Sequence, residues 1–113
     1  SVKYMLMAQE MDRAVAFYRD GMGFEENFSS PHWSELNVGD AILGLHEGGD
    51  GSRNPTGLSL QYEDVVRAFD RAIEFGATPL QRPERREGEP IILSTVIDPE
   101  GNEIMLTQYV GHE

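Results

Sequence analysis

The chain has 113 residues, of which 39% are hydrophobic and 26% charged, so it has the size and composition of one folded domain and not of a disordered chain. Asp and Glu total 20 against 9 Lys and Arg, and the resulting net charge of −11 argues against nucleic acid and anionic membrane surfaces as partners. The sequence shows no cysteine, no apolar run that would span a bilayer and no signal peptide, so disulfides and thiolate metal sites are excluded and we expect a cytoplasmic protein.

An internal repeat sets the order of the predicted elements. Residues 4–16 and 58–70 each contain a short strand of alternating apolar residues, then an acidic residue, then the start of a helix. The first helix is expected to end at 21–24 and the second at 75–77, because glycine follows the last periodic residue in both stretches. The sequence therefore predicts two copies of one strand–helix unit.

Three further strands are predicted after each helix. They are expected at 24–30, 32–38, 41–47, 77–82, 91–97 and 103–109. The Gly-, Ser-, Asn- and Pro-rich stretch 47–57 predicts a linker, and the charged stretch 82–90 predicts an exposed loop. We therefore expect an α+β fold in a single domain, 1–113, made of two tandem βαβββ modules at 1–50 and 57–113 with a linker at 51–56. Since each module has one helix, one face of a curved mixed sheet is left open as a groove.

The alternation of side chains along the strands predicts which residues face that groove. If Val38 pairs with Ala41 across the predicted turn, one face of this hairpin is apolar and the other is mixed. The same parity argument gives the full set of candidate ligand-binding residues: Lys3, Met5, Met7, Trp33, Glu35, Gly44, His46, Gly57, Ser59, Gln61, Met105 and Thr107. Methionine and tryptophan with a few polar groups suit a small, partly apolar organic ligand, although strands covered by a dimer partner would show the same pattern.

Two alternatives stay open for the polar members of this set. Glu35 and His46 are a general acid/base pair, two ligands of a displaced metal site, or an ordinary cross-strand polar pair. Trp33 either stacks on a ligand ring or fills an interface. His32 is expected to point to the other side of its strand, and His112 lies at the end of the chain, where we expect disorder.

Two stretches of the sequence resemble a known superfamily. The first stretch covers the helix at 10–20 and the Met22, Gly23 and Phe24 that follow it, and it resembles the first-module signature of the vicinal oxygen chelate superfamily. The second stretch, 98–104, resembles the second-module signature of the same superfamily. That superfamily includes glyoxalase I, bleomycin-resistance proteins, fosfomycin-resistance enzymes and extradiol dioxygenases. The resemblance covers about residues 3–110, and it implies the two-module fold and a homodimer; the reaction is not implied, because such folds host many functions.

Metal-binding members of this superfamily hold one divalent ion with His, Glu or Gln side chains. The corresponding positions of this sequence are Lys3, Gly44, Gly57 and Met105. A protonated lysine does not ligate a metal, glycine offers no side chain, and a thioether suits soft metals rather than Mg, Mn, Fe or Zn. We therefore expect no metal and no other cofactor at the family site.

The resemblance then favours one branch of the superfamily. Without a Lewis-acid metal, the bleomycin-resistance type remains, in which a groove sequesters a small molecule such as an antibiotic. The alternatives are a lyase, isomerase or dioxygenase-type enzyme with unusual site residues, and a degenerate protein that acts only through interactions. The net charge of −11 would attract a cationic ligand, or it serves solubility alone.

Overall fold

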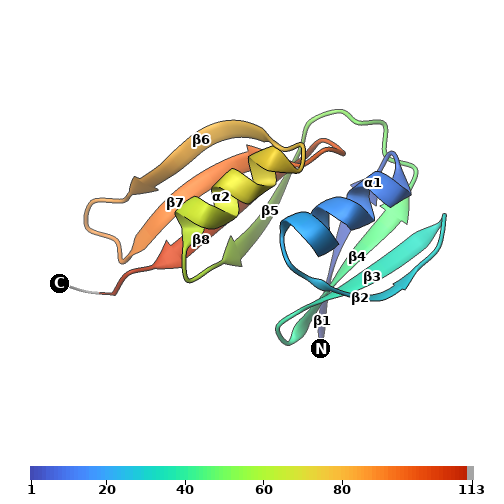
Figure 1. Cartoon of the computed structure of the whole chain (residues 1–113), viewed down its shortest axis with the longest axis horizontal. Coiled ribbons are helices and arrows are strands. Elements are labelled where there is room, and N and C mark those ends of the chain that lie inside the picture. Colours follow the sequence, from blue (N-terminus) through green and yellow to red (C-terminus); the bar gives the residue numbers. More distant parts are fainter. Residues whose placement is uncertain (112–113) are drawn as a thin grey trace.

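The computed structural model describes residues 1–111, so His112 lies outside the described residues (Figure 1). The first module contains β1 (Val2–Ala8), α1 (Met11–Ala16), the π-helical turn η1 (Phe17–Gly21), β2 (Glu25–Ser29), β3 (Trp33–Val38) and β4 (Ala41–Glu47). The second module contains β5 (Asn54–Gln61), α2 (Val65–Glu74), β6 (Thr78–Arg85), β7 (Ile91–Ile97) and β8 (Asn102–Tyr109). Within residues 1–111, no helix is both long and apolar enough to cross a membrane.

The strands form two mixed four-stranded sheets, one in each module. Their orders are β1-β4-β3-β2 and β5-β8-β7-β6, with β1 parallel to β4, β5 parallel to β8 and antiparallel pairing elsewhere. Figure 1 shows both helices on the near side of the sheets. The predicted α+β fold of two tandem βαβββ modules is confirmed, and so is the register in which Val38 pairs with Ala41 and Trp33 with His46.

The larger differences between the structure and the sequence prediction lie in three segments. The first helix changes to a π-helical turn, in which the backbone N–H of Met22 donates to the carbonyl oxygen of Phe17 over 2.9 Å. β5 begins at Asn54, inside the stretch expected to be a linker. β6 continues to Arg85 because it pairs with β7, so the charged stretch predicted as a loop is half strand.

The helices and the inner faces of both sheets share one core. Phe17, Tyr18 and Phe69 are almost completely buried. Ile73 and Phe75 are partly buried against the same cluster. One core that draws on both modules means that the modules pack as a unit.

The turn between β7 and β8 also joins the modules through polar contacts. The buried carboxylate of Glu100 accepts hydrogen bonds from the backbone N–H groups of Gln9 (2.9 Å) and Glu10 (2.8 Å), just before α1. Nε of Arg13 donates to the same carboxylate over 2.7 Å. Glu100 therefore caps the start of the first module's helix from the second module.

Asp98 in the same turn is the centre of a second buried network. Its carboxylate accepts hydrogen bonds from the Tyr18 hydroxyl (2.5 Å) and from the Asn102 side-chain amide (3.1 Å), and the amide also donates to the Met7 carbonyl oxygen over 2.8 Å. Burial raises the pKa of the Asp98 carboxyl, against the lowering effect of these hydrogen bonds. The 98–104 phrase thus has a structural role, which is to lock the two modules together.

Candidate functional site

The face of the first sheet that lies opposite α1 carries most of the predicted site residues of this module. The alternate residues of the same strands, among them Leu6, Leu36 and Leu43, are buried in the core under the helix. We call the opposite side the sheet-1 face, and its members are Lys3, Met5, Met7, Phe28, Trp33, Glu35, Gly44 and His46.

An ion pair and an indole lie at the centre of the sheet-1 face. Nζ of Lys3 and Nε1 of Trp33 both donate to Oε2 of Glu35, each over 2.8 Å. The ammonium also lies 5.6 Å from the centre of the indole ring, within range of a cation–π interaction. The hydrogen bond from Lys3, and after it the one from Trp33, lowers the pKa of the Glu35 carboxyl.

This arrangement gives a pH-dependent prediction. Replacing Lys3 by methionine is expected to raise the pKa of Glu35, because the larger of the two interactions that favour the carboxylate is lost. Since the folded-state pKa is depressed, the Glu35 contribution to stability is present above the unfolded-state pKa and is lost as pH falls through the folded-state pKa.

The resonance of the Trp33 Nε1–H group, which donates to Glu35, measures this pKa by NMR. Its titration midpoint should move to higher pH in Lys3→Met and stay in place in Arg53→Met, because Arg53 pairs with Glu103 instead. An unchanged midpoint in Lys3→Met would show that the ion pair does not form in solution.

The space beside Gly44 is filled by other side chains. A Cβ atom added there would lie 2.6 Å from Sδ of Met5 and 3.4 Å from the Trp33 ring. Gly44 is therefore buried beneath these two residues. Because glycine has no side chain, Met5 and Trp33 can pack over it, and they leave no opening in the sheet there.

Glu35 and His46 share the sheet-1 face, but Trp33 contacts both of them. The rings of Trp33 and His46 meet edge to face, with their centres 5.6 Å apart, and Nδ1 of His46 lies 2.6 Å from the carbonyl oxygen of Glu47. Within residues 1–111, no hydrogen bond or ion pair joins Glu35 to His46. His32 is exposed and pairs with the Glu47 carboxylate over 2.8 Å.

Phe28 is a member of the sheet-1 face that sequence analysis missed. The pairing of β2 with β3 shifts between Glu26 and Phe28, so that Phe28 and not Asn27 lies opposite Glu35. The Phe28 side chain is 46% exposed. No glycine marks this bulge in the sequence, so simple alternation along β2 gave no signal for it.

The predicted site residues of the second module line a different surface. Gly57 and Met105 line a cavity of about 180 Å³ together with Thr95 and Glu103, which sequence analysis did not include, and all of its lining residues come from this module. Ser59 and Gln61 are exposed on β5. Thr107 is buried, and its hydroxyl donates to the Leu60 carbonyl oxygen over 3.4 Å. Within one chain, the predicted residues therefore form two surfaces.

The side chains at the family's metal positions do not fit a divalent ion. The ammonium of Lys3 already forms an ion pair with the neighbouring carboxylate of Glu35. Gly44 has no side chain and is covered by Met5 and Trp33, and Met105 offers a thioether sulfur. Across the described part of the chain, no group of three or more His, Cys, Asp or Glu residues is placed to hold a metal ion. We therefore derive no chemistry from a metal at these positions.

The chain is similar to known proteins in sequence pattern and in fold. A family model described as a glyoxalase-like domain matches residues 3–107. A search of curated protein sequences finds no significant match. A glyoxalase/bleomycin resistance protein/dioxygenase family enzyme from Burkholderia phytofirmans PsJN is 19% identical, with a TM-score of 0.79 over 95% of this chain and 96% of that one.

Two further solved structures share the fold. A member of the glyoxalase/bleomycin resistance protein/dioxygenase superfamily from Sphaerobacter thermophilus is 23% identical, with a TM-score of 0.76 over 95% and 94% of the two chains. The bleomycin-binding protein from Streptomyces verticillus, complexed with copper(II)-bleomycin, is 20% identical, with a TM-score of 0.70 over 99% and 96%. The family model spans nearly the whole chain and the fold agrees with it, so this protein belongs to the glyoxalase-like domain family of the vicinal oxygen chelate superfamily.

Proposed function

We propose that the sheet-1 face binds a small, partly apolar organic molecule without a metal ion. The observation that carries this proposal is the 2.8 Å contact between Lys3 and Glu35 at a position where metal-binding relatives carry a ligand. A cation that belongs to the chain itself neutralises the carboxylate there. The function of the face is then binding through its own side chains.

The exposed apolar side chains around this ion pair support the proposal. Met5 and Met7 are each 41% exposed and Phe28 is 46% exposed, and all three lie on the same face of the sheet. Apolar side chains that gather in one patch mark a binding surface, whereas scattered single ones do not. Methionine adapts to the shape of a ligand, and Trp33 adds a flat aromatic surface with its N–H group already satisfied by Glu35. A ligand with a ring and an apolar part matches this surface.

The similarity to a bleomycin-binding protein supports a sequestering role. In this role, the protein binds an antibiotic and releases it without changing it chemically. The net charge of −11 favours a cationic ligand over an anionic one at this face. Acid/base catalysis by Glu35 and His46 is less well supported, because a carboxylate whose pKa is lowered is a weak general base at neutral pH.

A homodimer and a cytoplasmic location stay predictions. A second copy has a clear structural use, because the sheet-1 face and the cavity beside Met105 are separate surfaces in one chain. In a dimer, the first-module surface of one copy would be completed by the second-module surface of the other.

Fluorescence of Trp33, the single tryptophan, tests the proposal. Metal-free bleomycin and a panel of small cationic aromatic compounds would be titrated into protein treated with a chelator. We expect at least one compound to change the emission with saturation. Calorimetry should then show roughly tenfold or more weaker binding to Phe28→Ser, because the ligand no longer buries the exposed aromatic ring.

The matched control is Val66→Ser, which removes another exposed apolar side chain, on α2. It should bind as the unmodified protein does. If no compound in the panel binds, or if Phe28→Ser and Val66→Ser bind equally well, the sheet-1 face is not the binding surface.

A further inference from the structure

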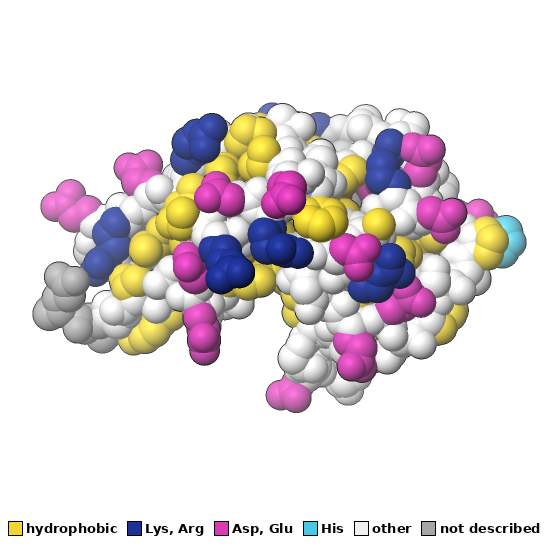
Figure 2. All heavy atoms as spheres, viewed as in Figure 1, with side chains coloured by type: hydrophobic (Ala, Val, Ile, Leu, Met, Phe, Trp, Pro, Cys, Tyr) yellow, Lys and Arg dark blue, Asp and Glu magenta, His cyan; other side chains and the backbone are white. Residues whose placement is uncertain are grey.

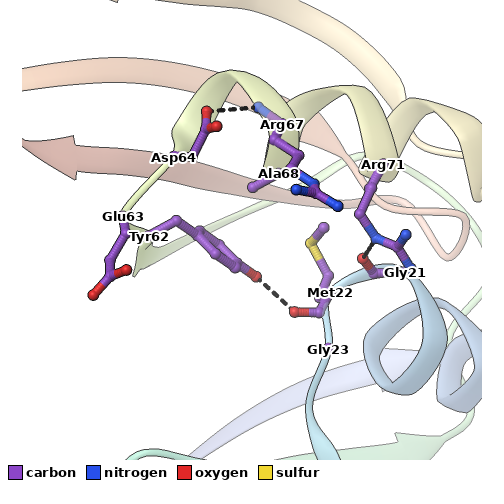
Figure 3. Close-up of a pocket in the computed structure, with 9 residues that line it drawn as sticks. All are labelled: Gly21, Met22, Gly23, Tyr62, Glu63, Asp64, Arg67, Ala68 and Arg71. Atoms are coloured by element: carbon purple, nitrogen blue, oxygen red, sulfur yellow. Dashed lines mark hydrogen bonds between the residues drawn. The ribbon is translucent and has the colours of Figure 1, made fainter.

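A second hollow lies at the junction of the modules, on the helix side of the molecule. It has a volume of about 370 Å³ and lies between the end of η1 and the start of α2 (Figure 3). We call it the junction pocket and define it by Met22, Tyr62, Arg67, Ala68 and Arg71. It lies apart from the sheet-1 face, because its residues come from the helices and the turns next to them.

The floor of the junction pocket is apolar and fixed in position. Met22 is 4% exposed and Ala68 is 7% exposed. The Tyr62 hydroxyl donates to the Met22 carbonyl oxygen over 3.2 Å, and Figure 3 shows the Met22 side chain between the tyrosine ring and the two arginines. This volume and this floor suit the apolar body of a small molecule.

Two arginine side chains line the rim of the pocket. The Arg71 guanidinium hydrogen-bonds to two backbone carbonyl oxygens: its Nε donates to Gly21 (3.2 Å) and its Nη2 to Asp20 (2.5 Å). It also lies 5.3 Å from the centre of the Phe75 ring. The Arg67 guanidinium makes no hydrogen bond or ion pair with residues 1–111. Because Arg67 and Arg71 are four residues apart on α2, they lie on one face of the helix.

In a chain with this excess of acidic residues, a basic side chain is expected to pair with a carboxylate. It has 20 acidic residues, and within residues 1–111 the basic side chains that form ion pairs with carboxylates include Lys3, Arg13, Arg19, Arg53 and Arg86. Figure 2 shows acidic and basic side chains intermingled over the helix side of the surface.

Glu63 and Asp64 also line the junction pocket, and among residues 1–111 neither carboxylate forms an ion pair with Arg67 or Arg71. Asp64 accepts a hydrogen bond from the backbone N–H of Arg67 over 3.1 Å, as the cap of α2. The Glu63 carboxylate points away from the pocket in Figure 3.

We propose that the junction pocket binds a small organic carboxylate with an apolar, aromatic body. The carboxylate would accept hydrogen bonds from Arg67 and from the free edge of Arg71, since the planar guanidinium matches the two oxygens of a carboxylate. The ring would lie on Met22 and Ala68, beside Tyr62. This site is independent of the proposed function of the sheet-1 face.

NMR titration of the ¹⁵N-labelled protein with sodium benzoate tests this site. We expect saturable shifts of the backbone amides around Met22 and at the start of α2, with the Trp33 indole resonance unchanged. Benzamide, the uncharged analogue, and inorganic phosphate should each bind at least about tenfold more weakly, because one lacks the charge and the other lacks the ring.

Two variants with the same change of charge complete the experiment. Arg67→Gln should weaken benzoate binding roughly tenfold or more, the usual effect of losing a charge-assisted hydrogen bond, whereas Arg86→Gln, at a cation paired with Glu89, should leave it unchanged. An unaltered spectrum away from position 67 would show that the variant is folded. Unsaturable shifts, equal binding of benzamide or phosphate, or equal effects of both variants would overturn the proposal.

Discussion

Replacing Asp98 by alanine is expected to lower the free energy of unfolding by about 3–5 kcal/mol, because several buried donors lose their acceptor and each costs about 1–3 kcal/mol. One carboxylate oxygen accepts from the backbone N–H groups of Glu100 (2.9 Å) and Asn102 (2.8 Å). The other accepts from the Tyr18 hydroxyl, which is completely buried. Chemical denaturation measured by circular dichroism gives the unfolding free energy.

The effect should depend on pH in a defined direction. Because the folded-state pKa of Asp98 is raised above its ordinary value of 3.8, the contribution of this group to stability is fully present below that value and falls as pH rises through the folded-state pKa. The difference between the unmodified protein and Asp98→Ala should therefore be larger at pH 4 than at pH 7.

Asp40 offers a matched control for this variant. It lies in the turn between β3 and β4, the position in the first module that corresponds to the 98–102 turn, and it is exposed. Asp40→Ala should change the unfolding free energy by no more than about 0.5 kcal/mol. Equal effects of the two variants would mean that the Asp98 network does not hold the modules together.

Replacing Gly101 by alanine is the second change with a large expected effect. Gly101 has φ of +99°, and an added Cβ would lie 2.3 Å from the carbonyl oxygen of Ser52 and 2.7 Å from that of Gly51. Those oxygens belong to the segment that connects the modules, so backbone must move. Backbone strain and overpacking together predict a loss of about 3–5 kcal/mol in unfolding free energy.

The variant Gly88→Ala distinguishes backbone strain from overpacking as the cause of this loss. It also has a positive φ, of +78°, but no atom lies within 4 Å of an added Cβ. Gly88→Ala should therefore cost about 1–2 kcal/mol, from its backbone conformation alone. Thermal and chemical denaturation of both variants measure the difference, and equal losses would refute the close contact between the 98–102 turn and the connecting segment.

Local pattern was enough to predict the elements and the pairing of the central hairpin. The apolar alternation and the turn at Val38–Ala41 fix which residues of β3 and β4 lie opposite each other, and the structure has that register. The repeat placed both helix starts, because each follows an alternating strand and an acidic residue. These features depend only on neighbouring residues.

The features that were not predicted depend on contacts between distant parts of the chain. The bulge that turns Phe28 outward is set by its pairing with β3, and the filling of the space at Gly44 by Met5 is set by the parallel pairing of β1 with β4. The carboxylate of Glu100 reaches Gln9 and Glu10 in the other module. Composition and periodicity contain no signal for such contacts.

We propose that the sheet-1 face acts without a metal ion, because Lys3 lies at a position that corresponds to a metal ligand in metal-binding relatives and pairs with Glu35. The most direct measurement is elemental analysis of the purified protein by mass spectrometry, followed by calorimetric titration of the chelator-treated protein with Mn²⁺, Ni²⁺ and Zn²⁺. We expect no stoichiometric metal in the purified protein and no saturable binding at a one-to-one ratio. If the unmodified protein binds one equivalent of a divalent ion and Glu35→Gln does not, the sheet-1 face is a metal site.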